Sequence, residues 1–208
     1  MRTIEIGRLL RAGTSGFVVG CRVSQLNTPS FGSLVSVSLE DGCQIYGLIH
    51  DIRIDDDGLV RQLITAEGVD EAIIADNRVN RNVPLEMSVL AVGYRQNGKV
   101  SHLLPPRPPL CLDVIYLCDD EELCGFTGSG RYGYFRHILR AAELPVGELL
   151  AAHLLQAQAA HQRAGDYEWA ISATKELIVL LRDDYPTLMT AISTLGDAIP
   201  EIWDMKGL

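Results

Sequence analysis

Gly125-Phe126-Thr127-Gly128-Ser129-Gly130-Arg131-Tyr132-Gly133 separates two parts of the chain that differ in hydrophobic periodicity. Before this stretch, apolar residues recur with a period near two, which is typical of β-strands; after it they recur with the helical period of about 3.6. Runs of strands followed by runs of helices are typical of the α+β class. The sequence therefore predicts an α+β protein in which a glycine-rich junction joins a strand-rich part to an all-α part.

The strand-rich part consists of short alternating or β-branched segments separated by turn residues. Residues 34–39 alternate, Glu40-Asp41-Gly42 supplies a hairpin turn, and residues 44–49 continue as the partner strand. Gln96-Asn97-Gly98-Lys99 contains the strongest hairpin signal in the chain. Four prolines between residues 105 and 109 fix φ and remove amide donors, so this segment is predicted to be an extended connector.

Asp119-Asp120-Glu121-Glu122 is interpreted as a solvated turn that ends the last strand. Four helices are predicted after Gly133, the third with Asp166 as its N-cap and the fourth with Pro186 in its first turn. Each helix has one apolar face. These faces are formed by Phe135, Ile138, Leu139 and Ala142; Leu150, Leu154, Ala157 and His161; Trp169, Ala173, Leu177, Leu180 and Leu181; and Leu188, Ile192, Leu195 and Ile199.

Composition excludes several classes of function. A formal net charge of −9 and a pI near 5.0 argue against broad binding to nucleic acid or to an anionic membrane surface. No uncharged apolar run reaches the roughly 18 residues of a membrane helix. Five cysteines without C-x-x-C spacing argue against a disulfide scaffold or zinc ribbon, so we expect reduced thiols and a cytoplasmic location. They are Cys21, Cys43, Cys111, Cys118 and Cys124.

A possible leader motif lies near the N-terminus. Residues 18–21 resemble the cleavage motif of a bacterial lipoprotein, but Glu5, Arg8 and Arg11 interrupt the apolar region that such a leader needs. We therefore expect residues 1–23 to belong to the mature protein.

The glycine-rich stretch resembles two nucleotide-binding signatures. Gly125 and Gly130 approximate G-x-x-x-x-G-K-[ST], and the glycines at 128, 130 and 133 spell G-x-G-x-x-G. Arg131 and Tyr132 stand where a phosphate-binding lysine and a magnesium-binding hydroxyl are needed. The residues after Gly133 also lack the repeated βαβ units of a nucleotide-hydrolysing domain. Passive anion binding is the remaining candidate, and it would involve Gly128, Ser129, Gly130 and Arg131.

Other candidate chemistry is sparse. The three consecutive aspartates at 55–57 do not alternate as calcium ligands in an EF-hand loop do. His153 and His161 are eight residues apart on one helix face, where buried histidines with satisfied hydrogen bonds are commoner than metal ligands. The sequence has neither H-E-x-x-H nor G-x-S-x-G. We therefore predict no catalytic residues, no metal site and no cofactor.

Four motifs together resemble a known family. They are Ile6-Gly7-Arg8, residues 31–35, residues 45–49, and the proline-rich segment 104–109 leading into residues 114–116. Over residues 4–127 the chain looks like the HAS barrel, a small β-barrel shared by the HerA family of hexameric ATPases and the ATP synthase catalytic-core subunits. In those ATPases the barrel helps to assemble a ring and offers a docking surface, while a separate downstream domain hydrolyses ATP.

The resemblance implies a six-stranded barrel over residues 1–124, a junction over 125–133 and a helical domain over 134–208. It also implies a non-enzymatic assembly or regulatory adaptor. The expected partner is a second copy or another protein, with a HerA-like ring ATPase as one candidate; neither a membrane nor direct nucleic-acid binding is expected. One alternative is a nucleotide-responsive or weakly hydrolytic protein that uses a degenerate phosphate loop at Gly125–Arg131. Another is a DNA-processing accessory that uses Arg78, Arg81, Arg95 and Lys99.

Overall fold

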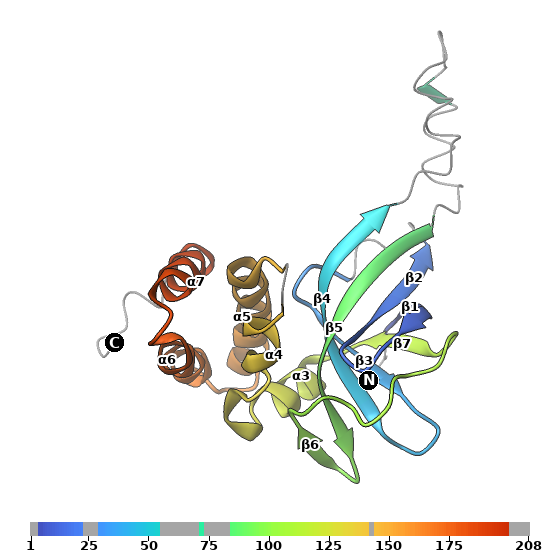
Figure 1. Ribbon diagram of the computed structural model, residues 1–208, viewed down its shortest axis with the longest axis horizontal. Helices are drawn as coiled ribbons and strands as arrows, with labels where there is room; N and C mark the ends of the chain where they lie inside the picture. The colour runs from blue at the N-terminus through green and yellow to red at the C-terminus, as the bar shows by residue number, and fades with distance from the viewer. Residues whose placement is uncertain (1–3, 23–28, 55–70, 73–83, 142–143, 200–208) are drawn as a thin grey trace.

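The computed structural model describes residues 4–22, 29–54, 71–72, 84–141 and 144–199. Strands form its N-terminal part, and helices gather on one side of them (Figure 1). This arrangement confirms the predicted α+β class. The strands are β1 (Ile4–Ala12), β2 (Gly16–Arg22), β3 (Leu34–Ser38), β4 (Gln44–Ile54), β5 (Pro84–Gln96), β6 (Lys99–Ser101) and β7 (Val114–Leu117).

The sheet closes into the six-stranded antiparallel barrel that the resemblance implied. The strand order is β2-β1-β7-β3-β4-β5-β6, and β2 also pairs with β5, which joins the two ends of the sheet. Strand β6 pairs only with β5 and extends the sheet outside the barrel as a hairpin. Asn97 and Gly98 form the hairpin turn with φ of 50° and 76°, which explains why this dipeptide favours the turn.

The described helices are α3 (Asp120–Thr127), α4 (Phe135–Leu139), α5 (Val146–Arg163), α6 (Trp169–Leu181) and α7 (Tyr185–Ala198). The last four correspond to the four predicted helices. In α7, Asp184 caps the N-terminus by accepting a hydrogen bond from the Thr187 amide at 3.2 Å, and Pro186 lies in the first turn as expected. The N-cap of α6 is Glu168 rather than the predicted Asp166.

Helix α3 corrects the prediction of a solvated turn at residues 119–122. Asp119 is the N-cap of this helix, and its carboxylate accepts a hydrogen bond from the Glu122 amide at 3.0 Å. The acidic residues that suggested a turn occupy the first helical turn, where the helix dipole favours negative charge. The remainder of the helix then buries Leu123 and Phe126. Helix formation therefore begins before the glycine-rich stretch rather than after it.

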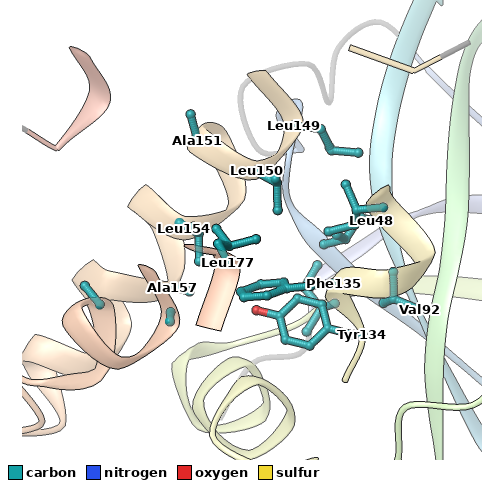
Figure 2. Packing of buried hydrophobic residues seen from close by; sticks show 14 of the residues in the cluster. Leu48, Val92, Tyr134, Phe135, Leu149, Leu150, Ala151, Leu154, Ala157 and Leu177 are labelled. Carbon is teal, nitrogen blue, oxygen red and sulfur yellow. The ribbon is translucent and has the colours of Figure 1, made fainter. Parts of the chain in front are cut away.

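Two hydrophobic clusters hold the molecule together. One fills the barrel and includes Ile6, Val35, Ile45 and Ile115. The other begins on strands β3, β4 and β5 and continues through every described helix. Figure 2 shows this second cluster, in which Leu48 and Val92 of the barrel lie near Tyr134, Phe135 and the α5 leucines. Barrel and helices therefore share a core.

Candidate functional site

The glycine-rich stretch begins inside a helix. Gly125 belongs to α3, and Gly128 ends that helix with its amide donating to the Cys124 carbonyl at 2.8 Å. The amide and hydroxyl of Ser129 both donate to the Phe126 carbonyl, at 3.3 and 2.8 Å. These donors are satisfied within the chain, and they lie at a helix C-terminus, whose partial negative charge disfavours anions.

A left-handed turn follows α3. Gly130, Arg131 and Tyr132 have φ of 58°, 48° and 56°, a conformation that costs a non-glycine residue roughly 1–2 kcal/mol. The Tyr132 ring stacks on Phe135, with ring centroids 5.6 Å apart, and meets Trp169 edge-on. Aromatic packing thus stabilises a strained reversal between α3 and α4. Of the predicted anion-binding groups, the backbone of Gly130 and the exposed side chain of Arg131 are left to contact an anion. Anion binding at this turn stays a prediction.

The turn packs against the buried imidazole of His102. Nε2 of His102 hydrogen-bonds to the Phe126 carbonyl at 3.1 Å, and the ring meets Phe126 and Tyr134 edge-on. Nδ1 packs directly against Gly130. A Cβ at residue 130 would lie 2.7 Å from this nitrogen, so glycine is required here by contact as well as by its φ.

Two basic side chains bind the backbone of the same histidine. The His102 carbonyl accepts hydrogen bonds from Arg136 and from Nε2 of His137, the latter at 2.8 Å. Burial lowers the pKa of both His102 and His137, and the nearby guanidinium of Arg136 lowers it further. Both imidazoles are therefore neutral at pH 7, and the segment after β6 is fixed to α4.

His153 joins the barrel to the helices through both ring nitrogens. Nδ1 bonds to the Gly32 carbonyl at 3.1 Å, and Nε2 bonds to the Tyr134 hydroxyl at 3.2 Å. A carbonyl can only accept, so Nδ1 carries the proton and Nε2 accepts from Tyr134. The ring is fully buried, which lowers its pKa to about 4. Gly32 has a φ of 83°, and a Cβ there would lie 2.8 Å from the Cβ of Ala152.

A second group of polar contacts ties the same barrel loop to α5. The Ser33 hydroxyl donates to Oε1 of Gln156 at 3.0 Å, and Nε2 of Gln156 donates to the Phe31 carbonyl at 3.1 Å. The loop before β3 is thus held to the middle of α5 by hydrogen bonds to Gln156 as well as to His153. We call the contacts of residues 30–33 with α5 the barrel–helix junction.

A hydroxyl, an imidazole and a carboxylate meet near the end of α3. Nε2 of His161 lies 2.9 Å from Oγ1 of Thr127, and Nδ1 lies 3.3 Å from the Asp166 carboxylate. This order matches a catalytic triad. However, Thr127 is completely buried and donates its proton to the Leu123 carbonyl at 2.7 Å. Trp169 also stacks on the imidazole, with centroids 4.5 Å apart, so neither the hydroxyl nor the ring faces solvent.

The prediction that two histidines of this helix are buried and have satisfied hydrogen bonds is therefore confirmed. His153 and His161 are both buried and hydrogen-bonded. Their partners could not be identified from sequence, because Gly32 is 121 residues from His153 and Thr127 is 34 residues from His161. The one available signal was their common helix face, which indicated burial but not what lies opposite.

The cysteines are free thiols and lie in both parts of the molecule. Burial raises the pKa of Cys21, Cys43, Cys118 and Cys124, which disfavours the nucleophilic thiolate. Within the described ranges no group of three or more His, Cys, Asp or Glu side chains could hold a metal ion. The aspartates at 55–57 lie outside those ranges.

The residues of the nucleic-acid alternative are only partly described. Arg78 and Arg81 lie outside the described residues. Arg95 lies over the Tyr46 ring, 5.6 Å from its centroid, and Lys99 begins β6 on the same hairpin. Among the described helices, none has the length and apolar character to cross a membrane.

Three exposed leucines lie where β1 meets the proline-rich connector. Leu10, Leu110 and Leu112 are 44%, 67% and 68% exposed, and we call them the leucine patch. The Leu112 amide donates to the Leu9 carbonyl at 2.8 Å, which fixes the connector against β1. Leu112 has a φ of 72°, a strained conformation for a leucine. Hydrogen bonding therefore holds an apolar side chain in solvent at an energetic cost.

The chain matches no protein-family model, and comparison with curated proteins also gave no match. The resemblance to the HAS barrel consequently rests on the short sequence motifs and stays a prediction.

Proposed function

We propose that this protein is a non-catalytic assembly or regulatory adaptor of the cytoplasm whose barrel mediates oligomerisation or docking. A HerA-like ring ATPase is one candidate partner. The proposal is supported by the closed six-stranded antiparallel barrel followed by helices, together with the HAS-barrel motifs in the sequence. In the ATPases that the chain resembles, such a barrel makes protein contacts and hydrolysis occurs in another domain.

The leucine patch is the observation that carries the proposal. Leu110 and Leu112 are each about two-thirds exposed, although a leucine side chain gains roughly 1.5–3 kcal/mol when it is fully buried. Backbone strain at Leu112 adds a further cost of about 1–3 kcal/mol. Strained conformations concentrate at functional sites, and exposed apolar patches mark contact surfaces. A protein partner that covers the patch would recover the burial energy.

The buried histidines also fit a structural role. His102, His153 and His161 are buried, neutral and hydrogen-bonded to groups of this chain. Burial of this kind keeps them from a substrate, whereas a general base must reach the proton that it abstracts. The exposed surface, rather than the polar interior, is therefore where we place the function.

Light scattering of the native protein and of a Leu110→Asp/Leu112→Asp variant tests the proposal. We expect the native protein to self-associate or to co-purify with a stable protein partner, and the double variant to lose that association. Leu180→Asp is the control, because this leucine is 44% exposed on α6 and lies outside the patch. A native protein that is monomeric and purifies without a stable partner would contradict the proposal.

A further inference from the structure

A cleft of about 760 Å³ lies between strand β4 and the α4–α5 connection. Phe31 of the barrel–helix junction, Leu90 of β5 and Leu144 line it, and all three are partly buried against the core that barrel and helices share. In Figure 1 this is the side of the barrel on which the helices lie. Small-molecule sites concentrate where two parts of a molecule meet, and cavities of roughly 300–1,000 Å³ hold drug-sized ligands. The cleft therefore has the position and the size of a ligand site.

The helical wall of the cleft is entirely apolar among the described residues. Ala141 and Pro145 join Leu144 in this wall, and no polar side chain lines the cleft from the helices. Phe31, Leu90 and Leu144 stay only partly buried, so the fold leaves apolar surface in contact with water here. A ligand with an apolar body would remove that surface from water, which is the main source of affinity in sites of this kind.

All the polar side chains that line the cleft come from β4. A β-bulge lies there, because the β4–β5 register shifts between Ile49 and Asp51 and makes His50 the extra residue. Bulges redirect side chains and are common beside binding sites. The imidazole of His50 is half-buried, and burial lowers its pKa, so the ring is neutral at pH 7. A neutral imidazole can donate one hydrogen bond to a ligand.

Hydrogen-bond donors outnumber acceptors at this polar end. Nε of Arg53 pairs with one carboxylate oxygen of Asp51 at 2.5 Å, and the two side chains are 74% and 34% exposed. The Nη groups of Arg53 remain available among the described contacts, and His50 adds a further N–H. The only carboxylate that faces these donors is that of Asp51. A ligand that supplies acceptor oxygens, and above all a carboxylate, matches this set of donors.

We propose that the cleft binds a small carboxylic acid with an apolar, ring-containing body. The carboxylate accepts hydrogen bonds from Arg53 and His50, and the body packs between Phe31, Leu90 and the apolar helical wall. The leucine patch is not part of the cleft, so this ligand site goes beyond the proposed adaptor function. The two proposals fail independently, because their tests change different residues.

Three probes that share one ring system and differ in the charge of the head group test the proposal. They are 2-naphthoate, the uncharged 2-naphthamide and the cationic 2-naphthylmethylammonium, and binding to the full chain is followed by ¹H–¹⁵N NMR. We expect saturable binding of 2-naphthoate with a dissociation constant of roughly 0.1–1 mM, which is typical for a molecule of this size. The amide binds roughly five- to tenfold more weakly and the ammonium more weakly still. The shifted signals belong to residues 50–53, Ala141 and Leu144.

Two substitutions separate the head group from the ring. Arg53→Gln weakens 2-naphthoate by roughly five- to tenfold and leaves 2-naphthamide nearly unchanged, because the amide does not depend on the guanidinium charge. Arg182→Gln is the matched control, since Arg182 is also an exposed arginine paired with a nearby aspartate, and it changes neither probe. Ala141→Trp fills the cleft with an indole ring and weakens both probes.

Three results overturn the proposal. One is the absence of saturable 2-naphthoate binding at millimolar concentrations. Another is a set of shifted signals that lies away from the cleft, because the probe then binds elsewhere. The third is tighter binding of the ammonium than of the carboxylate, which would make Asp51 the polar contact and a cation the ligand.

Discussion

Gly32 allows the barrel backbone to lie directly against α5. An added Cβ would lie within 2.8 Å of both the Ala152 Cβ and the His153 backbone nitrogen, and neither position belongs to a flexible side-chain end. The glycine also has a left-handed φ of 83°. The hydrogen bond from His153 depends on this approach, because its acceptor is the carbonyl of the same glycine.

We predict that Gly32→Ala destabilises the protein by more than about 2 kcal/mol, because it combines a steric clash with an unfavourable φ. Gly42→Ala is a matched control: its φ is 77°, but no atom lies within 4 Å of the added Cβ. The control isolates the backbone cost of about 1 kcal/mol. Urea unfolding of both variants measures the difference. Equal losses for the two substitutions would show that α5 can move away from residue 32.

Protonation of His153 links stability to pH. The pKa of this histidine is about 4 in the folded protein and 6.5 in the unfolded chain, because burial disfavours the imidazolium. Above pH 6.5 both states are neutral and the full stability is present. Between pH 6.5 and 4 only the unfolded state takes up the proton, so stability falls by about 3 kcal/mol in total. The lowered pKa values of His102, His137 and His161 act in the same direction.

Chemical unfolding at a series of pH values tests this linkage. We predict that His153→Gln is less stable than the native protein at pH 7.5, but that its stability falls less between pH 6.5 and 4. Carboxylates that titrate near pH 4 contribute equally to both proteins and cancel in the difference. Identical pH profiles would mean that His153 is protonated in the folded state.

At the scale of elements, the capping of α3 can be measured directly. Asp119→Ala removes the side chain that accepts from the Glu122 amide, and we predict a loss of about 1 kcal/mol in the free energy of unfolding. Asp119→Asn retains most of the stability, because asparagine is also a good N-cap. Thermal and urea unfolding of both variants provide the measurement. An equal loss for alanine and asparagine would indicate that charge, rather than capping, stabilises this end of the helix.

The sequence was most informative where structure depends on neighbouring residues. The Asn97-Gly98 turn and the helix with Asp184 and Pro186 at its start follow from local backbone preferences. Helix α3 was missed because acidic residues suit both a solvated turn and a first helical turn, and only tertiary packing of Phe126 distinguishes them. The six-stranded barrel was inferred from a family resemblance, since closure by β2 and β5 joins residues about 70 positions apart.

The candidate sites were less accessible to sequence reasoning. The nucleotide-like glycines form a pattern along the chain, but the structure places Gly125 inside a helix and Gly130 in a left-handed turn. The leucine patch has no sequence signature, because its residues come from segments about 100 positions apart that only the fold brings together.

At the scale of the whole molecule, barrel and helices are predicted to unfold together, because one hydrophobic cluster includes residues of both. Leu150→Ala in α5 should lower the unfolding midpoint of the barrel and of the helices equally, with a loss of roughly 2–5 kcal/mol. Far-ultraviolet circular dichroism follows the helices, and methyl NMR signals of Ile45 and Ile115 follow the barrel interior. A barrel signal that persists after the helical signal has been lost would divide the molecule into independent units.

The buried Thr127, His161 and Asp166 have a practical consequence for the recognition of enzymes. Their atoms match the spacing of a hydrolase triad, so a template built from coordinates alone would select this protein. A fluorophosphonate reagent, in contrast, needs an accessible hydroxyl whose proton can pass to the imidazole. Here the Leu123 carbonyl accepts that proton, and the Trp169 ring covers one face of the base. A hydroxyl, an imidazole and a carboxylate that hydrolyse esters in one protein can therefore hold two helices together in another.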